Sequence, residues 1–400
     1  MKRFLNLATR TKLFFGFGLM IIVLGIVVVT AYKVISAIQE SERAIYEEDF
    51  ATAVDLKTLG LSGEPVLLAD AVGGTTAGRP GFSSSNNGVL VYARGSAATA
   101  GRELFWVDRS GKRSGPVGPP VNATTLKLSP DGKRIAFSDT STGTPGTDIW
   151  IHEFDRNLRT RLTTNAATDD NPIWSPDGSQ LIFNSTRDGV SGLYEKPSNG
   201  ANAERLVYKS EPGADLSALD WSRDSRLVLF AKSARGQIFR DLWVMPMTGD
   251  QKPYPYLVTP FDKSQASLSP NGRWAAYVSR ESGMYQVVVQ PFPDPSAGKW
   301  QISTDGGIRP RWRADGEELY YEDRSNRIVS VSVTTNQKFE VGKSTPLLQT
   351  SLTFPNPPIT FPYDAAPDGL RFVISELSGV GPNNTSPLTV VLNWAYLLKQ

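Results

Sequence analysis

The sequence contains no cysteine and only one histidine among its 400 residues. The absence of cysteine excludes disulfides, thiolate metal sites and cysteine nucleophiles. A serine triad or a histidine metal cluster would have to depend on His152 alone. In a strand, alternation places that residue on the same face as Trp150 and Phe154, so we expect it to be structural or solvent-facing. We predict neither a metal nor a cofactor.

An excess of charge of one sign is also missing. The formal net charge is only +2, and nucleic-acid binding needs clustered Lys and Arg, so we predict no nucleic-acid partner. The 35 glycines and 28 prolines, in a chain that is 40% hydrophobic, indicate a globular protein rich in turns.

Residues 13–32 contain no charged side chain and are long enough to cross a bilayer as a helix. Lys2, Arg3, Arg10 and Lys12 precede this run, so the positive-inside rule predicts a cytoplasmic tail at 1–12 and places the remainder of the chain in the periplasm or outside. A cleaved signal peptide is the alternative. The predicted location is the bacterial inner membrane, with a single pass.

Residues 33–60 lack glycine and proline apart from Gly60, and Ile38, Ile45 and Leu59 fall at heptad spacing. This pattern predicts a helical stalk and, as a further hypothesis, a homodimer formed through it.

A turn motif recurs after the stalk, most clearly as Ser-Pro-Asp-Gly at 129–132 and 175–178. Proline presets the turn, Asp or Asn caps it, and glycine accepts a positive φ. Because Asn replaces Asp in one copy, we interpret these positions as structural repeat turns rather than acidic sites. Counting a first copy at 85–88, there are seven; the later copies contain Asp131, Gly132, Asp177, Gly178, Asp224, Asn271, Gly272, Asp315, Gly316, Asp368 and Gly369.

The copies are spaced 44 to 53 residues apart, close to the length of a four-stranded propeller blade. Apolar strands follow the turns, and aromatic residues recur at fixed offsets. We therefore predict an all-β fold, a seven-bladed propeller over 63–400, with six blades as the alternative. We expect residues 65–72 to complete the last blade as its outer strand.

The segment Trp174-Ser175-Pro176-Asp177-Gly178, with Leu181-Ile182-Phe183, resembles the TolB-type, WD-repeat-like propeller. From about residue 63 onward, the chain is similar to the carboxy-terminal propellers of bacterial transmembrane serine/threonine kinases, but it lacks the kinase motifs. Residues 1–60 resemble the start of methyl-accepting chemotaxis receptors. These resemblances imply a membrane-anchored module, outside the cytoplasm, for sensing or protein binding.

Arg309, Arg311 and Arg313 alternate along a predicted inner strand. If they share a face that lines the central channel, they could hold a carboxylate or phosphate ligand. The alternative is that they pair with Asp315, Glu317 or carboxylates of a neighbouring blade.

We interpret the chain as a non-catalytic scaffold or sensor that binds a protein, a peptide or a component of the cell envelope, because no serine-hydrolase, kinase or metal-site motif is present. One alternative is a hydrolase or other enzyme that uses acidic and arginine residues of the channel. Another is a chemoreceptor-like ligand sensor that acts through a partner chain. A channel with unpaired charges would favour the enzyme, and a channel with paired groups would favour the scaffold.

Overall fold

The computed structural model describes residues 82–84, 89–93, 101–140, 146–237, 239–336, 338–352, 360–377 and 388–392. The chain divides into two compact units, one made of Met1–Thr99 with Ser386–Gln400 and the other of Ala100–Thr385. In the first unit, β1 (Phe82–Ser84), β2 (Val89–Ala93) and β27 (Leu388–Leu392) form a three-stranded antiparallel sheet.

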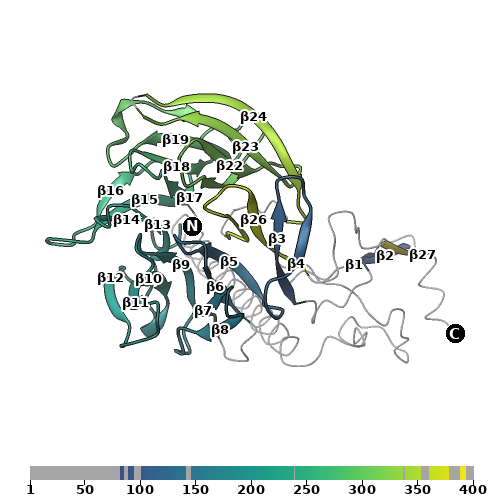
Figure 1. The fold of residues 1–400 in the computed structure, drawn as a ribbon, viewed down its shortest axis with the longest axis horizontal. Coiled ribbons are helices and arrows are strands. Elements are labelled where there is room, and N and C mark those ends of the chain that lie inside the picture. The colour runs from purple at the N-terminus through teal and green to yellow at the C-terminus, as the bar shows by residue number, and fades with distance from the viewer. Residues whose placement is uncertain are drawn as a thin grey trace, which may run out of the picture. The chain divides into compact units, whose positions relative to one another are not determined.

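The second unit contains six four-stranded antiparallel sheets arranged as the blades of a propeller (Figure 1). Each blade is given below from its innermost strand outward. The first blade is β5 (Ala123–Leu128), β6 (Arg134–Asp139), β7 (Asp148–Glu153) and β8 (Leu158–Arg161). The second is β9 (Asp169–Trp174), β10 (Gln180–Ser185), β11 (Gly192–Pro197) and β12 (Arg205–Lys209), with the 3-10 helix η2 (Arg187–Gly189) between β10 and β11.

The next three blades follow the same order along the chain. The third is β13 (Asp215–Trp221), β14 (Leu227–Ser233), β15 (Arg240–Pro246) and β16 (Tyr254–Leu257). The fourth is β17 (Lys263–Leu268), β18 (Trp274–Ser279), β19 (Gln286–Pro291) and β20 (Trp300–Gln301), with the 3-10 helix η3 (Pro295–Ala297) before β20. The fifth is β21 (Ile308–Trp312), β22 (Glu318–Glu322), β23 (Arg327–Thr334) and β24 (Glu340–Gln349).

The sixth blade closes the ring with strands from both ends of the unit. Its inner strands are β25 (Tyr363–Ala365) and β26 (Arg371–Leu377), and its outer strands are β3 (Arg102–Asp108) and β4 (Arg113–Pro116). β26 pairs with β3 along its whole length, from Arg371 opposite Asp108 to Leu377 opposite Arg102. This splice leaves no blade of the ring short of a strand.

The structure therefore corrects the predicted count of seven blades to six. The counted copy at 85–88 lies between β1 and β2, which belong to the separate three-stranded sheet, so it does not mark a blade. The prediction that 65–72 completes the last blade is also wrong, because β3 and β4 occupy its outer positions. β27 pairs with β2 and is not part of the sixth blade.

The repeat turns join the two innermost strands of each blade with one hydrogen-bonding pattern. In the first blade, Gly132 N donates to Ser129 O at 2.8 Å, and Lys133 N donates to the Asp131 carboxylate at 3.1 Å. Gly132 has a φ of 67°, which glycine adopts without steric cost. Asn271 accepts from Arg273 N at 3.1 Å in the same way, so the side-chain oxygen, and not the charge, is what this turn uses.

Apolar residues on both faces of the blades form a cluster at every junction of the ring. Ile149 with Phe183 joins the first and second blades, and Leu242 with Tyr277 joins the third and fourth. The remaining clusters join the second to the third, the fourth to the fifth, the fifth to the sixth and the sixth to the first. This continuous packing explains why aromatic residues recur at fixed positions of the repeat.

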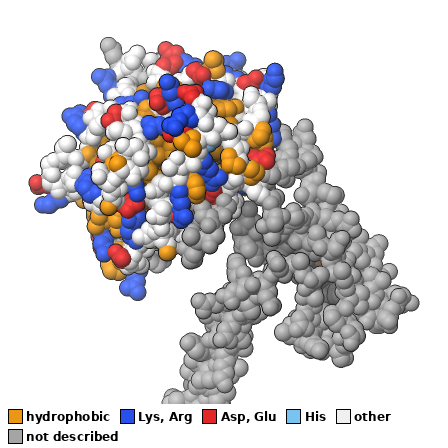
Figure 2. Space-filling view, turned by 60° about the horizontal axis from the view of Figure 1, so that its bottom comes forward, with side chains coloured by type: hydrophobic (Ala, Val, Ile, Leu, Met, Phe, Trp, Pro, Cys, Tyr) orange, Lys and Arg blue, Asp and Glu red, His pale blue; other side chains and the backbone are white. Residues whose placement is uncertain are grey.

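On the surface, basic and acidic side chains are intermingled on the face that Figure 2 displays, as the near-zero net charge suggests. The predicted tail, membrane helix and stalk, at 1–12, 13–32 and 33–60, lie outside the described residues. Within the described ranges, no helix is both long enough and apolar enough to span a bilayer.

Candidate functional site at the channel mouth

A cavity of about 120 Å³ lies where the innermost strands of all six blades reach the repeat turns. We call it the channel mouth. Residues two positions before each repeat turn share one place in the repeat, and five of them line the cavity together with the turns themselves. Those five are Lys127, Asp220, Ser267, Arg311 and Asp364.

The two carboxylates of the channel mouth hold neighbouring blades together. Asp220, in the third blade, accepts from Leu268 N at 2.8 Å and from the Ser267 hydroxyl at 3.2 Å, both in the fourth blade. Asp364, in the sixth blade, accepts from Leu128 N of the first blade at 2.9 Å. These backbone N–H groups would otherwise be left without an acceptor, so both carboxylates are already committed to the ring.

The cations of the channel mouth are less fully engaged. Lys127 Nζ lies 3.5 Å from Asp220 Oδ1 and retains further donors. Arg223 is exposed on the rim, where the other repeats mostly have proline. Arg311 is buried, with Nε 3.0 Å from Asp364 Oδ1 and its guanidinium carbon 4.1 Å from the ring centre of Phe361. Of these three cations, Arg223 is exposed, Lys127 is half-buried and Arg311 is buried.

Tryptophans at the ends of the inner strands fix the shape of the channel mouth. Trp174 Nε1 donates to Lys127 O at 3.0 Å, and Trp312 Nε1 donates to Ser267 O at 3.0 Å. Each bond joins a blade to the one before it. These tryptophans thus position the backbone of residues that line the channel mouth. Their indole N–H groups already donate to backbone carbonyls.

Below the mouth, Phe361 lies among the innermost strands. Its carbonyl accepts from Leu126 N at 2.9 Å, and its ring belongs to the cluster that contains Leu219 and Ala266. The neighbouring Thr360 carbonyl accepts from Gln265 Nε2 at 2.8 Å. Contacts to several blades at once make Phe361 a floor beneath the cavity.

The three predicted ligand-binding arginines do not converge on one position. β21 has a register shift between Ile308 and Arg311, and Arg309 has a φ of 59°, so simple alternation fails there. Arg309 pairs with Glu322 and donates to Thr360 O at 3.0 Å, while Arg311 pairs with Asp364. Burial raises the pKa of Glu322, against the lowering effect of Arg309.

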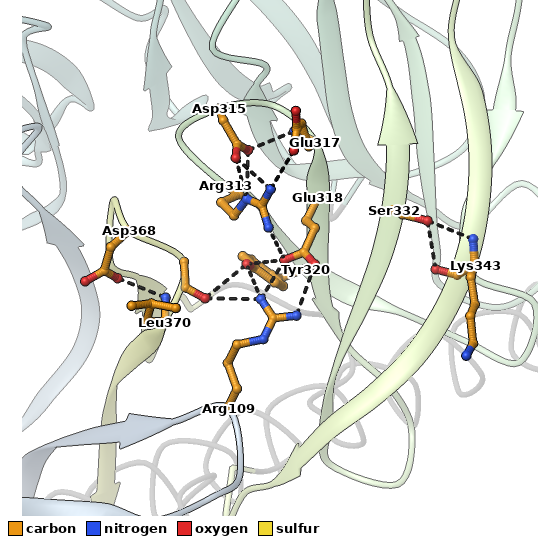
Figure 3. Close-up of polar contacts among 11 residues, drawn as sticks. Arg109, Arg313, Asp315, Glu317, Glu318, Tyr320, Ser332, Lys343, Asp368 and Leu370 are labelled. Carbon is orange, nitrogen blue, oxygen red and sulfur yellow. Dashed lines mark hydrogen bonds and ion pairs between the residues drawn. The ribbon is translucent and has the colours of Figure 1, made fainter.

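Arg313 lies outside this group, in the repeat turn of the fifth blade (Figure 3). Its guanidinium is 2.6 Å from Asp315 and 2.9 Å from Glu317, and it also lies 3.1 Å from Glu318. Of the three arginines, only Arg311 is both buried and among the residues that line the channel mouth. The three arginines therefore pair with carboxylates of their own or a neighbouring blade, as the alternative interpretation of the sequence expected.

The predicted turn residues all lie in the turns between the first and second strands of their blades. Gly178, Gly272, Gly316 and Gly369 repeat the positive φ of Gly132. Asp177, Asp224, Asp315 and Asp368 each accept from a backbone N–H two residues further on. Hydrogen bonds from Ser175 and Ser179 lower the pKa of Asp177 to about 2, so this carboxylate stays ionised and bound within its own turn.

His152 is buried in β7 and is not among the residues that line the channel mouth. Burial and the nearby Arg159 lower its pKa, and its ring meets Phe154 edge to face at 5.8 Å. Among the described residues, no group of His, Asp and Glu side chains is placed to hold a metal ion.

Sequence reasoning missed Lys127, Asp220 and Asp364. The repeat itself carried the signal, because each of these residues stands two positions before its turn, as Arg311 does. An alignment of the repeats on their turns would have shown that the four charged residues occupy the same position of the repeat.

The fold and this mouth define a six-bladed propeller with a polar opening where the innermost strands reach the repeat turns. Within that class, a family model described as the TolB beta propeller domain matches residues 110–290 of this chain. A solved TolB structure from Agrobacterium tumefaciens has the same fold, with a TM-score of 0.53 and 17% identity over 70% of this chain and 99% of that one.

Two curated relatives match shorter stretches. The chain is 26% identical over 165 residues to tricorn protease homolog 1 of Streptomyces coelicolor, covering 38% of this chain and 14% of that protein. It is 35% identical over 79 residues to an uncharacterized protein of Agrobacterium fabrum, covering 20% of this chain and 26% of that protein. The chain therefore matches only a small part of either relative.

Proposed function

We propose that this chain is a non-catalytic binding module whose channel mouth receives an acidic segment of a protein or peptide. The observation that carries the proposal is that the carboxylates of the channel mouth have their hydrogen-bonding partners, whereas two of its cations have donors left. Asp220 and Asp364 are engaged by backbone N–H groups of neighbouring blades, whereas Lys127 and Arg223 face the cavity with donors to spare. A cavity of about 120 Å³ admits a side chain, while the surrounding turns offer a rim for the remaining segment.

The pairing of the buried channel charges supports binding over catalysis. Arg309 contacts Glu322, and Arg311 contacts Asp364, so these groups neutralise each other within the ring. An enzyme that used them would need a general acid or base free to exchange protons with a substrate. Propellers host many functions, so this argument depends on the site and not on the fold.

The cellular setting that we propose follows the charge pattern around 13–32. A single membrane helix there, with the stalk at 33–60, would anchor the chain in the bacterial inner membrane and hold the propeller in the periplasm. The match to the TolB family model favours a partner in the cell envelope.

Site-specific photocrosslinking tests the proposal. A benzophenone amino acid replaces Arg223 at the rim in one variant of the full chain, and replaces Arg156, which is 70% exposed in the β7–β8 turn, in a second variant. After irradiation in cells, we expect a discrete adduct from position 223 that position 156 does not give. Adding Lys127→Met should reduce the adduct at 223, because it removes a cation from the mouth.

Mass spectrometry of the adduct identifies the crosslinked segment, which should contain Asp or Glu next to the attachment point. Identical adducts from 223 and 156, or an adduct that Lys127→Met leaves unchanged, would contradict binding at the mouth.

A further inference from the structure

Exposed apolar side chains gather on the loops at the ends of the strands opposite the repeat turns. Phe239 is 41% exposed, Val258 55%, Phe261 41% and Met284 40%. They lie in the β14–β15, β16–β17 and β18–β19 loops of the third and fourth blades. We call these four residues the apolar rim. Exposed clusters of this kind mark sites where a partner or a membrane binds.

Hydrogen bonds to Asp262 hold the three loops together. Arg240 N, next to Phe239, donates to Asp262 Oδ1 at 2.9 Å, and Arg280 N donates to Asp262 O at 3.2 Å. In the same way, Thr259 N, next to Val258, donates to the Asp241 carboxylate at 3.2 Å. The apolar rim is therefore a fixed feature of one end of these blades.

Basic side chains outnumber acidic ones around the apolar rim. The cations are Arg235, Arg240, Lys263, Arg280, Lys299 and Arg324, and the carboxylates are Asp241, Asp262, Glu281 and Asp305. Each of these carboxylates has an ion-pair or hydrogen-bond partner among the residues around the apolar rim.

Asp262 is buried and lies 4.0 Å from Arg240, Glu281 pairs with Lys299, and Asp241 bonds Thr259. Arg235 is exposed, and Arg280 is half-buried with its guanidinium 5.6 Å from the ring centre of Tyr285. Neither has a carboxylate partner among the described residues. Lys263 also lacks one, but it is buried and donates to the Thr259 hydroxyl at 2.7 Å.

We propose that the apolar rim docks the propeller onto a bilayer surface that contains anionic phospholipid. Apolar side chains on loop tips can enter the boundary between headgroups and acyl chains, while Arg235 and Arg280 remain at the level of the lipid phosphates. Aromatic rings such as Phe239 and Phe261 suit this boundary, since they supply apolar area on short side chains.

Charge complementarity favours lipid over a second copy of the chain. A two-fold contact places the same patch of both copies face to face, so two patches with an excess of positive charge would oppose each other. An anionic headgroup layer instead attracts Arg235 and Arg280. Docking by this face also turns the channel mouth, at the other ends of the strands, away from the bilayer, so the proposal goes beyond the proposed binding function.

The absence of cysteine allows a clean test in the full chain. Met284→Cys in the rim and Val341→Cys in β24, which is 42% exposed, each carry a nitrobenzoxadiazole label on the only thiol. Each protein is reconstituted into phosphatidylcholine vesicles that contain about one third phosphatidylglycerol, and into phosphatidylcholine alone. The label reports local contact with lipid, whatever anchors the rest of the chain.

We expect the label at 284, and not the label at 341, to shift to shorter wavelength and to be quenched by nitroxide-bearing lipid in the anionic vesicles. Arg235→Gln and Arg280→Gln should each lower the ratio of docked to undocked protein ~5-fold, and added salt should act in the same direction. Arg156→Gln, at the opposite ends of the strands, should leave the ratio unchanged.

Equal signals from 284 and 341 would overturn the proposal, as would a shift at 284 that does not depend on anionic lipid. A shift that rises with protein concentration in detergent without lipid would show that a second copy covers the rim, and would overturn it as well.

Discussion

Arg109 and Glu318 lie 209 residues apart in the sequence and form a two-pronged ion pair. Arg109 Nη1 is 2.7 Å from Glu318 Oε2, and Nη2 is 3.0 Å from Oε1 (Figure 3). Arg109 stands in the turn between β3 and β4, the outer strands of the sixth blade, whereas Glu318 begins β22 of the fifth blade. The pair therefore fastens the amino-terminal part of the closing blade to its neighbour.

Glu318→Gln should destabilise the propeller by about 1–3 kcal/mol, because charge-assisted hydrogen bonds from Arg109 and Tyr320 lose their charged acceptor. Urea unfolding at neutral pH measures the change in the free energy of unfolding. The matched control is Glu153→Gln, which removes an ion pair with Arg156 at 3.4 Å on the surface and should cost less than about 0.5 kcal/mol. Equal losses in free energy of unfolding in the two variants would show that the Arg109–Glu318 pair stabilises the fold no more than a surface ion pair does.

The same carboxylate predicts a pH dependence in acid. Burial alone would raise the pKa of Glu318, but hydrogen bonds from Arg109 and Tyr320, with the charges of Arg109 and Arg313, lower it to about 2. Because the pKa in the folded state is depressed below the ordinary value of 4.5, this group stabilises the fold fully above that value. Its contribution is lost as the pH falls from 4.5 towards 2.

The difference in free energy of unfolding between wild type and Glu318→Gln should thus be constant near neutral pH and shrink as the pH drops below about 4.5. Urea titrations of both proteins at matched pH values measure it. A difference that stays constant down to the lowest pH at which both remain folded would contradict the lowered pKa.

The spacing of the turns was sufficient to predict an all-β propeller, because one turn chemistry recurs once per blade. It was not sufficient to count the blades. A turn motif marks the connection of two strands, and the strands that flank the copy at 85–88, β1 and β2, belong to the three-stranded sheet and to no blade. The partner of a strand depends on packing between distant segments, so neither the pairing of β26 with β3 nor that of β2 with β27 follows from local sequence.

The candidate site was predicted less well, for a physical reason visible at Asn171, Gln265 and Arg309. All three stand four positions before a repeat turn, and all three have a positive φ of 53°, 47° and 59°. No glycine signals this conformation, so alternation along the inner strand was assumed to continue. The bulge instead sends Arg309 to Glu322 and leaves Arg311 at the channel mouth.

Ser225 occupies a turn position that glycine holds in the other blades. Its φ is 62°, beside 70° for Gly272 in the next turn. A side chain at this φ is strained, so Ser225→Gly should raise the free energy of unfolding by about 0.5–1 kcal/mol. The matched reverse change, Gly272→Ser, should lower it by a similar amount, since no atom within 4 Å would meet the added Cβ.

Thermal or urea unfolding of both variants gives the two changes. Opposite signs are expected, and a shift in the same direction for both would show that backbone conformation does not govern these turns.

Phe361 provides the last test, because one side chain beneath the channel mouth contacts strands of several blades. Its ring is 4% exposed, lies 4.1 Å from the Arg311 guanidinium carbon and packs in the cluster with Leu219 and Ala266. Phe361→Ala should cost about 3–4 kcal/mol, whereas Phe361→Leu, which keeps most of the volume, should cost about 1–1.5 kcal/mol.

Hydrogen exchange distinguishes a local effect from a loss of ring stability. The Leu126 amide is bonded to the Phe361 carbonyl, and the Val228 amide, in the core of the third blade, is not. If Phe361 stabilises the whole ring, Phe361→Ala should speed exchange at both amides by the same factor. Faster exchange at Leu126 alone would mean that Phe361 only seals the floor of the channel, and the expected cost to global stability would then be wrong.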